Sequence, residues 1–102
     1  MTHSIPINLP PAEVLDELSR RYGIKELALF GSVMRDDFRS DSDVDVLVEF
    51  QPGVRNGLFA FVRLQRELEE ILGRPVDLVP KDGLKPIIRD HVINSSQVIY
   101  AI

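Results

Sequence analysis

The sequence predicts an α/β domain in which helices pack on a small mixed β-sheet, and two kinds of periodicity predict it. Apolar residues recur at helical spacing in three segments, and short apolar or alternating runs separate these segments. Glycine or proline stands at most of the boundaries. The expected order is helix, strand, a short helical start, strand, helix, strand, helix, strand. We expect one domain spanning residues 1–102.

Residues 11–22 are predicted to form the first helix, preceded by a loose arm over residues 1–9. Pro11 suits a first helical turn, and Gly23 suits a C-terminal cap. The apolar face of this helix would consist of Val14, Leu15, Leu18 and Tyr22.

Two strands are expected next. Residues 26–30 are a short apolar run closed by a Gly-Ser pair, which predicts a buried strand followed by a turn. Residues 43–50 alternate between two faces, as a half-buried strand does. The core face would contain Val44, Val46, Val48 and Phe50. The other face begins with Asp43 and Asp45, whose positions lie about 6–7 Å apart along the strand.

The C-terminal half is predicted to contain two helices and two strands: a helix over 58–72, a strand over 76–79, a helix over 84–94 and a strand over 97–102. The residues expected to face inward are Leu58, Phe61, Leu68, Ile71 and Leu72 in the first helix and Leu84, Ile87, Ile88 and Val92 in the second. Charged pairs four residues apart, Arg63 with Glu67 and Arg66 with Glu70, are expected on the solvent side.

Composition narrows the class of protein. The hydrophobic fraction of 44% and the charged fraction of 27% are those of an ordinary soluble globular protein. The formal net charge of -4 argues against a general nucleic-acid-coating role. The absence of cysteine excludes disulfides, zinc–cysteine sites and thiol nucleophiles. No apolar run reaches the roughly 20 residues that span a bilayer, and the first residues do not read as a secretory signal, so we expect a cytoplasmic protein.

Phosphate and cation chemistry is suggested by one short segment. Gly31 and Ser32 follow a strand, where free N–H groups favour anions, although Gly-Ser pairs also close many ordinary strands. Asp43 and Asp45 offer the hard oxygen ligands that Mg²⁺ prefers, but they also fit a solvated strand end. Asp77 interrupts an otherwise apolar strand; it is either a third ligand or an exposed residue of an edge strand.

The two histidines are expected to be without catalytic roles. His3 lies in the N-terminal arm. His91 falls on or near the predicted inward face of the last helix, where a packed, hydrogen-bonded histidine is expected.

The pattern Gly31-Ser32, Asp43-Val44-Asp45 and a later Asp77 on a strand resembles the polymerase-beta-like nucleotidyltransferase superfamily. Within it the chain is similar to the minimal nucleotidyltransferases, the MntA-like antitoxins encoded beside HEPN-domain toxins. The resemblance covers nearly the whole chain. Further matching residues are Arg35, Ser42, Leu84, Pro86, Ile87, Arg89, Ile93, Val98, Ile99 and Tyr100. Asp36 departs from the family, which commonly has glycine there.

The resemblance implies a role for each motif residue. Asp43 and Asp45 would bind two Mg²⁺ ions, and Asp77 would complete one ion site and help to deprotonate the acceptor hydroxyl. The remaining motif residues, Gly31, Ser32 and Arg35, would hold the triphosphate of ATP. Arg35 fits equally well a salt bridge to a neighbouring aspartate.

An antitoxin enzyme is the leading function that the resemblance implies. It would transfer AMP from ATP to a hydroxyl, a tyrosine of a cognate HEPN ribonuclease toxin, and so silence the toxin. Two alternatives remain open from the sequence. The chain could block its toxin by binding alone, or it could modify small molecules together with a separate substrate-binding subunit.

Overall fold

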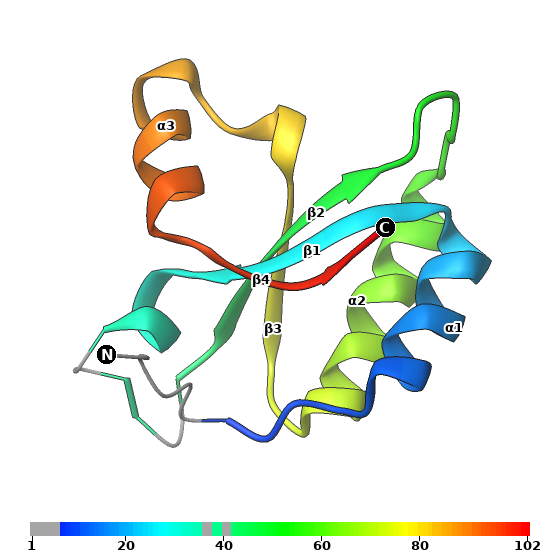
Figure 1. Ribbon diagram of the computed structural model, residues 1–102, viewed down its shortest axis with the longest axis horizontal. Helices are drawn as coiled ribbons and strands as arrows, with labels where there is room; N and C mark the ends of the chain where they lie inside the picture. The colour runs from blue at the N-terminus through cyan, green and yellow to red at the C-terminus, as the bar shows by residue number, and fades with distance from the viewer. Residues whose placement is uncertain (1–6, 36–37, 40–41) are drawn as a thin grey trace.

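The computed structural model describes residues 7–35, 38–39 and 42–102 (Figure 1). Its elements are α1 (Ala12–Tyr22), β1 (Ile24–Phe30), the 3₁₀ turn η1 (Gly31–Met34), β2 (Val44–Phe50), α2 (Leu58–Leu72), β3 (Val76–Pro80), the 3₁₀ turn η2 (Lys81–Gly83), α3 (Pro86–Ser95) and β4 (Gln97–Ala101). This order confirms the prediction. His3, most of the N-terminal arm and Asp36 lie outside the described residues.

The four strands form one mixed sheet in the order β3-β2-β1-β4. β1 runs antiparallel to both β2 and β4, whereas β2 and β3 are parallel. Parallel neighbours need a long crossover connection, and α2 provides it between β2 and β3. The predicted mixed sheet with packed helices is therefore confirmed.

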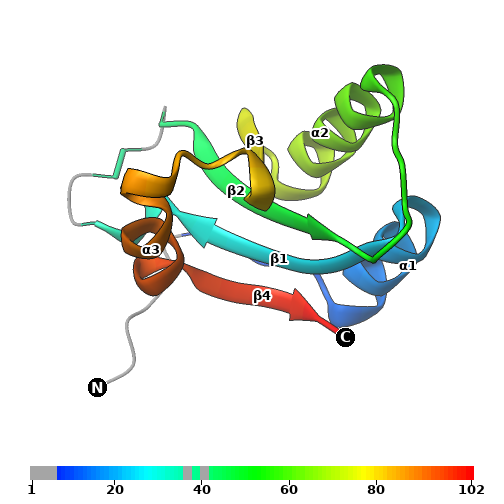
Figure 2. The same cartoon turned by 90° about the horizontal axis from the view of Figure 1, so that it is seen from above.

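The main core lies between the sheet and the helix pair α1 and α2, which run side by side in both views (Figures 1 and 2). The predicted core face of β2 is buried at Val44, Val46 and Val48, with Phe50 packed against it. Leu58, however, is 75% exposed, whereas Leu64 is fully buried in its place. Leu58 is the first residue of α2, and the buried residues of this helix begin later, at Leu64. The inward prediction for Leu58 was therefore wrong.

The opposite face of the sheet is partly covered by η2 and α3. Leu47 and Ala28 pair across β2 and β1 on this face, and both are buried. α3 itself buries none of its residues: Ile87 is 90% exposed, and His91 is also exposed. The predictions of an inward Ile87 and a packed His91 were therefore wrong, because α3 covers the sheet only loosely.

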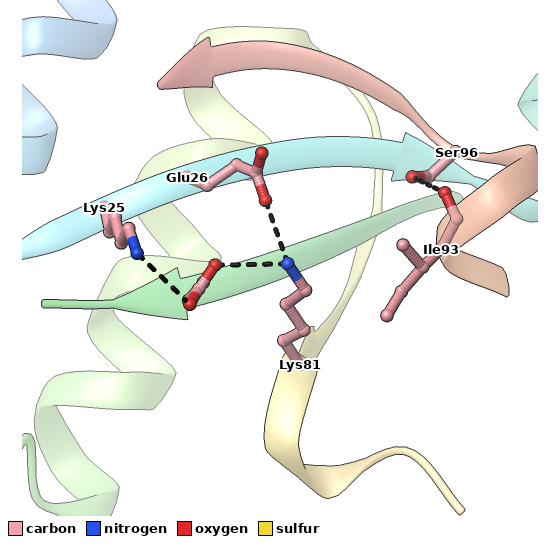
Figure 3. A network of polar contacts seen from close by, with 6 residues as sticks. Lys25, Glu26, Lys81, Ile93 and Ser96 are labelled. Atoms are coloured by element: carbon pink, nitrogen blue, oxygen red, sulfur yellow. Dashed lines mark hydrogen bonds and ion pairs between the residues drawn. The ribbon is translucent and has the colours of Figure 1, made fainter. Parts of the chain in front are cut away.

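Ion pairs tie the η2 segment to the sheet. The ammonium of Lys81 lies 3.3 Å from an oxygen of Glu26 on β1 and 3.2 Å from one of Glu49 on β2 (Figure 3). Burial alone lowers the pKa of Lys81, but the hydrogen bonds to Glu49 and Glu26 outweigh it and raise the pKa. The two ion pairs of Lys81 fix the start of the segment that leads to α3.

A second polar link joins α1 to α2. Glu67 accepts hydrogen bonds from Arg21, at 2.7 Å, and from the hydroxyl of Tyr22. These hydrogen bonds, led by that of Arg21, lower the pKa of Glu67. Glu67, predicted to pair with Arg63 along its own helix, thus bonds across to α1 instead.

None of the helices in the described part of the chain is long and apolar enough to cross a membrane.

Replacing Glu67 by Gln should weaken the α1–α2 link in a pH-dependent way. The folded-state pKa of Glu67 lies below its ordinary value of 4.5, so its contribution is present above that pH and disappears as pH falls through the folded-state pKa. At pH 7 the variant should lose about 1 kcal/mol of unfolding free energy, because the group is partly exposed.

Urea unfolding of both proteins at pH 7 and at the lowest pH at which both remain folded measures this difference, which should be smaller in acid. The exposed Glu70 on the same helix supplies the control, Glu70→Gln, with an expected change within about 0.5 kcal/mol. An equal loss at both pH values would contradict the assignment.

Candidate active site

Strand register brings two of the predicted carboxylates together. β2 and β3 are parallel, and Asp45 and Asp77 are direct partners in the ladder. In-register partners project to the same side of a sheet, so the two side chains flank one site. Asp43 lies two residues before Asp45, on the same side and just outside β2. Asp43 and Asp77 are exposed, whereas Asp45 is half-buried.

Asp45 is the electrostatic centre of this group. Burial raises the pKa of its carboxyl, and the negative charges of Asp77 and Asp43 raise it further. Arg35 and a hydrogen bond from the backbone N–H of Ser32 act in the opposite direction without cancelling the shift. The pKa of Asp45 is therefore raised overall, and a positive charge nearby would stabilise its ionised form.

Gly31 presses against the same carboxylate. Its φ of +74° lies in the left-handed region that favours glycine, and a Cβ atom built there would stand 2.0 Å from Oδ2 of Asp45. Gly31 also directly follows Phe30, which pairs with Asp45 across β1 and β2. The Gly-Ser turn therefore packs against Asp45. Only glycine at position 31 leaves space for this carboxylate.

The three carboxylates fit a divalent cation by their donor chemistry. Carboxylate oxygens suit Mg²⁺, and a cation would relieve the repulsion that raises the pKa of Asp45. Among residues 7–35, 38–39 and 42–102, no group of three acidic, histidine or cysteine side chains already converges as a metal site.

The residues that are expected to hold the triphosphate act on Asp45 in different ways. The backbone N–H of Ser32 donates to Asp45 and thereby orients the carboxylate. Arg35 ends the turn and is exposed, and its charge acts on Asp45. Gly31, Ser32 and Arg35 therefore all lie near Asp45, and their expected contact with a triphosphate stays a prediction.

One neighbour of this site was missed. A pocket of about 360 Å³ adjoins the turn, and its lining residues are Gly31, Met34, Arg35, His91 and Ser95. His91 and Ser95 come from α3, about 60 residues after the turn in the sequence. Only an exposed face of α3 would have revealed His91 as a site residue, and the apolar residues of this helix suggested the opposite.

Gly31→Ala should test the contact with Asp45, with Gly53→Ala as the matched control. Gly53 also has a positive φ, of +83°, but nothing lies within 4 Å of its added Cβ. The control should lose about 1 kcal/mol for its backbone conformation. Gly31→Ala should lose about 1–3 kcal/mol more, because the methyl group displaces the Asp45 carboxylate.

Denaturant unfolding measures both variants. In an Asp45→Ala background, Gly31→Ala should be no more destabilising than Gly53→Ala, because the clash has been removed. An extra loss that persists there would place the strain elsewhere.

Comparison with known proteins identifies the family. Residues 12–99 match the nucleotidyltransferase domain. Protein adenylyltransferase MntA of Thermococcus cleftensis is 42% identical over 84 residues, which cover 82% of this chain and 81% of that protein. A solved structure described as a minimal nucleotidyltransferase matches with a TM-score of 0.68 at 38% identity, over 87% of each chain.

More distant solved structures share the fold. A toxin–antitoxin complex with AMP-PNP contains a chain that matches with a TM-score of 0.69 at 20% identity, over 91% of this chain and 75% of that one. With the family match and the 42% identical relative, the conclusion is direct: this chain belongs to the nucleotidyltransferase domain family and is a relative of the MntA-type minimal nucleotidyltransferases.

Proposed function

We propose that this chain is an antitoxin that transfers AMP from ATP to a tyrosine hydroxyl of a HEPN-domain toxin and thereby silences it. The observation that carries the proposal is the in-register pairing of Asp45 with Asp77 beside the Gly31 turn. This arrangement supports the proposal because carboxylates that could hold a cation lie next to a turn that could hold phosphate, and a nucleotide-dependent transfer uses both.

The relatives support the choice of donor and acceptor. The 42% identical protein of Thermococcus cleftensis is a protein adenylyltransferase. A structure with the same fold, at 19% identity and a TM-score of 0.61, is the MNT antitoxin of Shewanella oneidensis in complex with a tri-AMPylated HEPN toxin.

The proposed reaction is an in-line displacement at the α-phosphorus of ATP. The acceptor oxygen forms a bond to this phosphorus while the bond to the bridging oxygen of pyrophosphate breaks, and pyrophosphate leaves. Asp77, exposed at the edge strand β3, would accept the proton of the hydroxyl.

Asp43 and Asp45 would hold two Mg²⁺ ions, with Asp77 as a further ligand to one of them. Magnesium bound there supplies Lewis-acid stabilisation of the charge on the triphosphate. Arg35, through its guanidinium, would contact phosphate oxygens. Asp45 keeps its orientation because the Ser32 N–H holds it and Gly31 leaves it room.

Asp45→Asn should remove transfer while leaving the fold intact. The amide keeps an oxygen that can accept the Ser32 N–H, but it loses the charge that a cation needs, so AMP transfer should fall about a hundredfold or more. The free energy of unfolding should not decrease, because one of three repelling charges has gone. Labelled AMP transfer to a co-expressed HEPN toxin and urea unfolding provide the two readouts.

Asp82→Asn provides the control, since Asp82 is an exposed aspartate of η2 outside the carboxylate group, and its transfer rate should match that of the wild type. Full activity of Asp45→Asn would overturn the catalytic assignment. Growth of cells that carry the toxin gives a separate readout. Protection by a transfer-dead variant would mean that binding alone neutralises the toxin.

A further inference from the structure

We infer that α3 completes the nucleotide site and that His91 binds the β- and γ-phosphates of ATP from the pocket beside Gly31. This inference rests on the proposed nucleotidyl transfer and adds a residue that faces the leaving pyrophosphate. It assigns a phosphate-binding role to a histidine for which the sequence predicted only packing.

The pocket lies between the turn and α3. Its volume of about 360 Å³ falls in the range of small-ligand sites. η1 contributes Gly31 and Met34, Arg35 follows directly after η1, and α3 contributes His91 and Ser95. The five lining residues thus come from segments on both sides, and a ligand there would contact both.

The lining has the donor chemistry of an anion site. Arg35 carries a guanidinium, His91 offers a ring N–H in either tautomer, and the five lining residues include no carboxylate. Ser95 is already engaged with its own helix, because its hydroxyl lies 2.8 Å from the carbonyl oxygen of His91 and 3.3 Å from that of Val92. Of the two α3 residues that line the pocket, His91 is therefore the one that would donate a hydrogen bond to a phosphate.

Gly31 is common to this pocket and to the surroundings of Asp45. A Cβ atom on Gly31 would meet the Asp45 carboxylate, and the residue also lines the pocket. A triphosphate needs both environments: cation ligands near the reacting phosphorus and hydrogen-bond donors around the two phosphates that leave. On the pocket side, Arg35 and His91 supply side-chain donors.

The attachment of α3 suits such a role. The helix buries none of its residues, and the segment before it is held by Lys81 through the ion pairs to Glu26 and Glu49 (Figure 3). A helix held at its start can shift towards a ligand without leaving a hole in the core.

Binding measurements on His91→Ala, His91→Gln and Asn94→Ala in the full chain test the inference. Calorimetric titration with ATP, inorganic tripolyphosphate and AMP, each with Mg²⁺, separates the phosphate end from the nucleoside end. His91→Ala should weaken both ATP and tripolyphosphate binding about tenfold, the loss of one hydrogen bond to a charged group. AMP binding should not change.

His91→Gln, which keeps an N–H donor, should restore part of the affinity, and the KM for ATP should follow the same order. Asn94→Ala is the control, because Asn94 is exposed on the same helix and does not line the pocket. Circular dichroism confirms that each variant folds.

Unchanged tripolyphosphate and ATP binding by His91→Ala would overturn the inference while leaving the proposed function in place. An equal loss of AMP binding would overturn it too, because His91 would then contact the nucleoside. If the wild type transferred no AMP to a HEPN toxin, the proposed function would fail. Selective loss of tripolyphosphate binding in His91→Ala would even then support the phosphate pocket.

Discussion

The parallel pairing of β2 with β3 is the constraint on which the site depends. It aligns Asp45 with Asp77 and leaves their carboxylates beside each other at a net energetic cost. The apolar residues that alternate with them, Val44, Val46 and Leu78, are buried, so hydrophobic packing holds the strands together against this repulsion. The fold thus maintains an arrangement of like charges that a bound cation would relieve.

The backbone of the turn after β1 also helps to position Asp45. Gly31 and the N–H of Ser32 both touch Asp45, one by leaving space and the other by a hydrogen bond. The motif residues therefore act on each other before any substrate is present. Their close spacing in the sequence therefore serves packing inside the protein.

Local patterns predicted the parts of the fold that depend on local physics. The alternation from Asp43 to Phe50 predicted β2. The helical spacing predicted α2 with the same first and last residues, Leu58 and Leu72, as in the structure. Contacts across elements were harder to predict. Glu67 has a candidate partner along its own helix, Arg63, but bonds instead to α1, and only the packing of the two helices decides between them.

The proximity of Asp45 and Asp77 was predictable, because each of them interrupts an apolar strand, and the two residues are direct partners in the β2–β3 ladder. The position of His91 was not predictable, since a few apolar residues near it resemble a buried face. α3 instead follows η2 and packs only loosely on the sheet. It buries none of its own residues, and Ile87 and Ile88 are exposed. Lys81 holds the segment before this helix through ion pairs to residues far away in the sequence, which no periodicity predicts.

The sparse burial of α3 also has a thermodynamic consequence. A helix that removes little apolar surface from water opens at low free energy, and its amide hydrogens exchange early relative to those of the core strands. A ligand that contacts such a helix must spend part of its interaction energy on ordering it. Apparent affinity for a nucleotide would then report the rigidity of Pro86–Ser95 as well as the contacts made, and two relatives with identical carboxylates would differ in affinity through this helix alone.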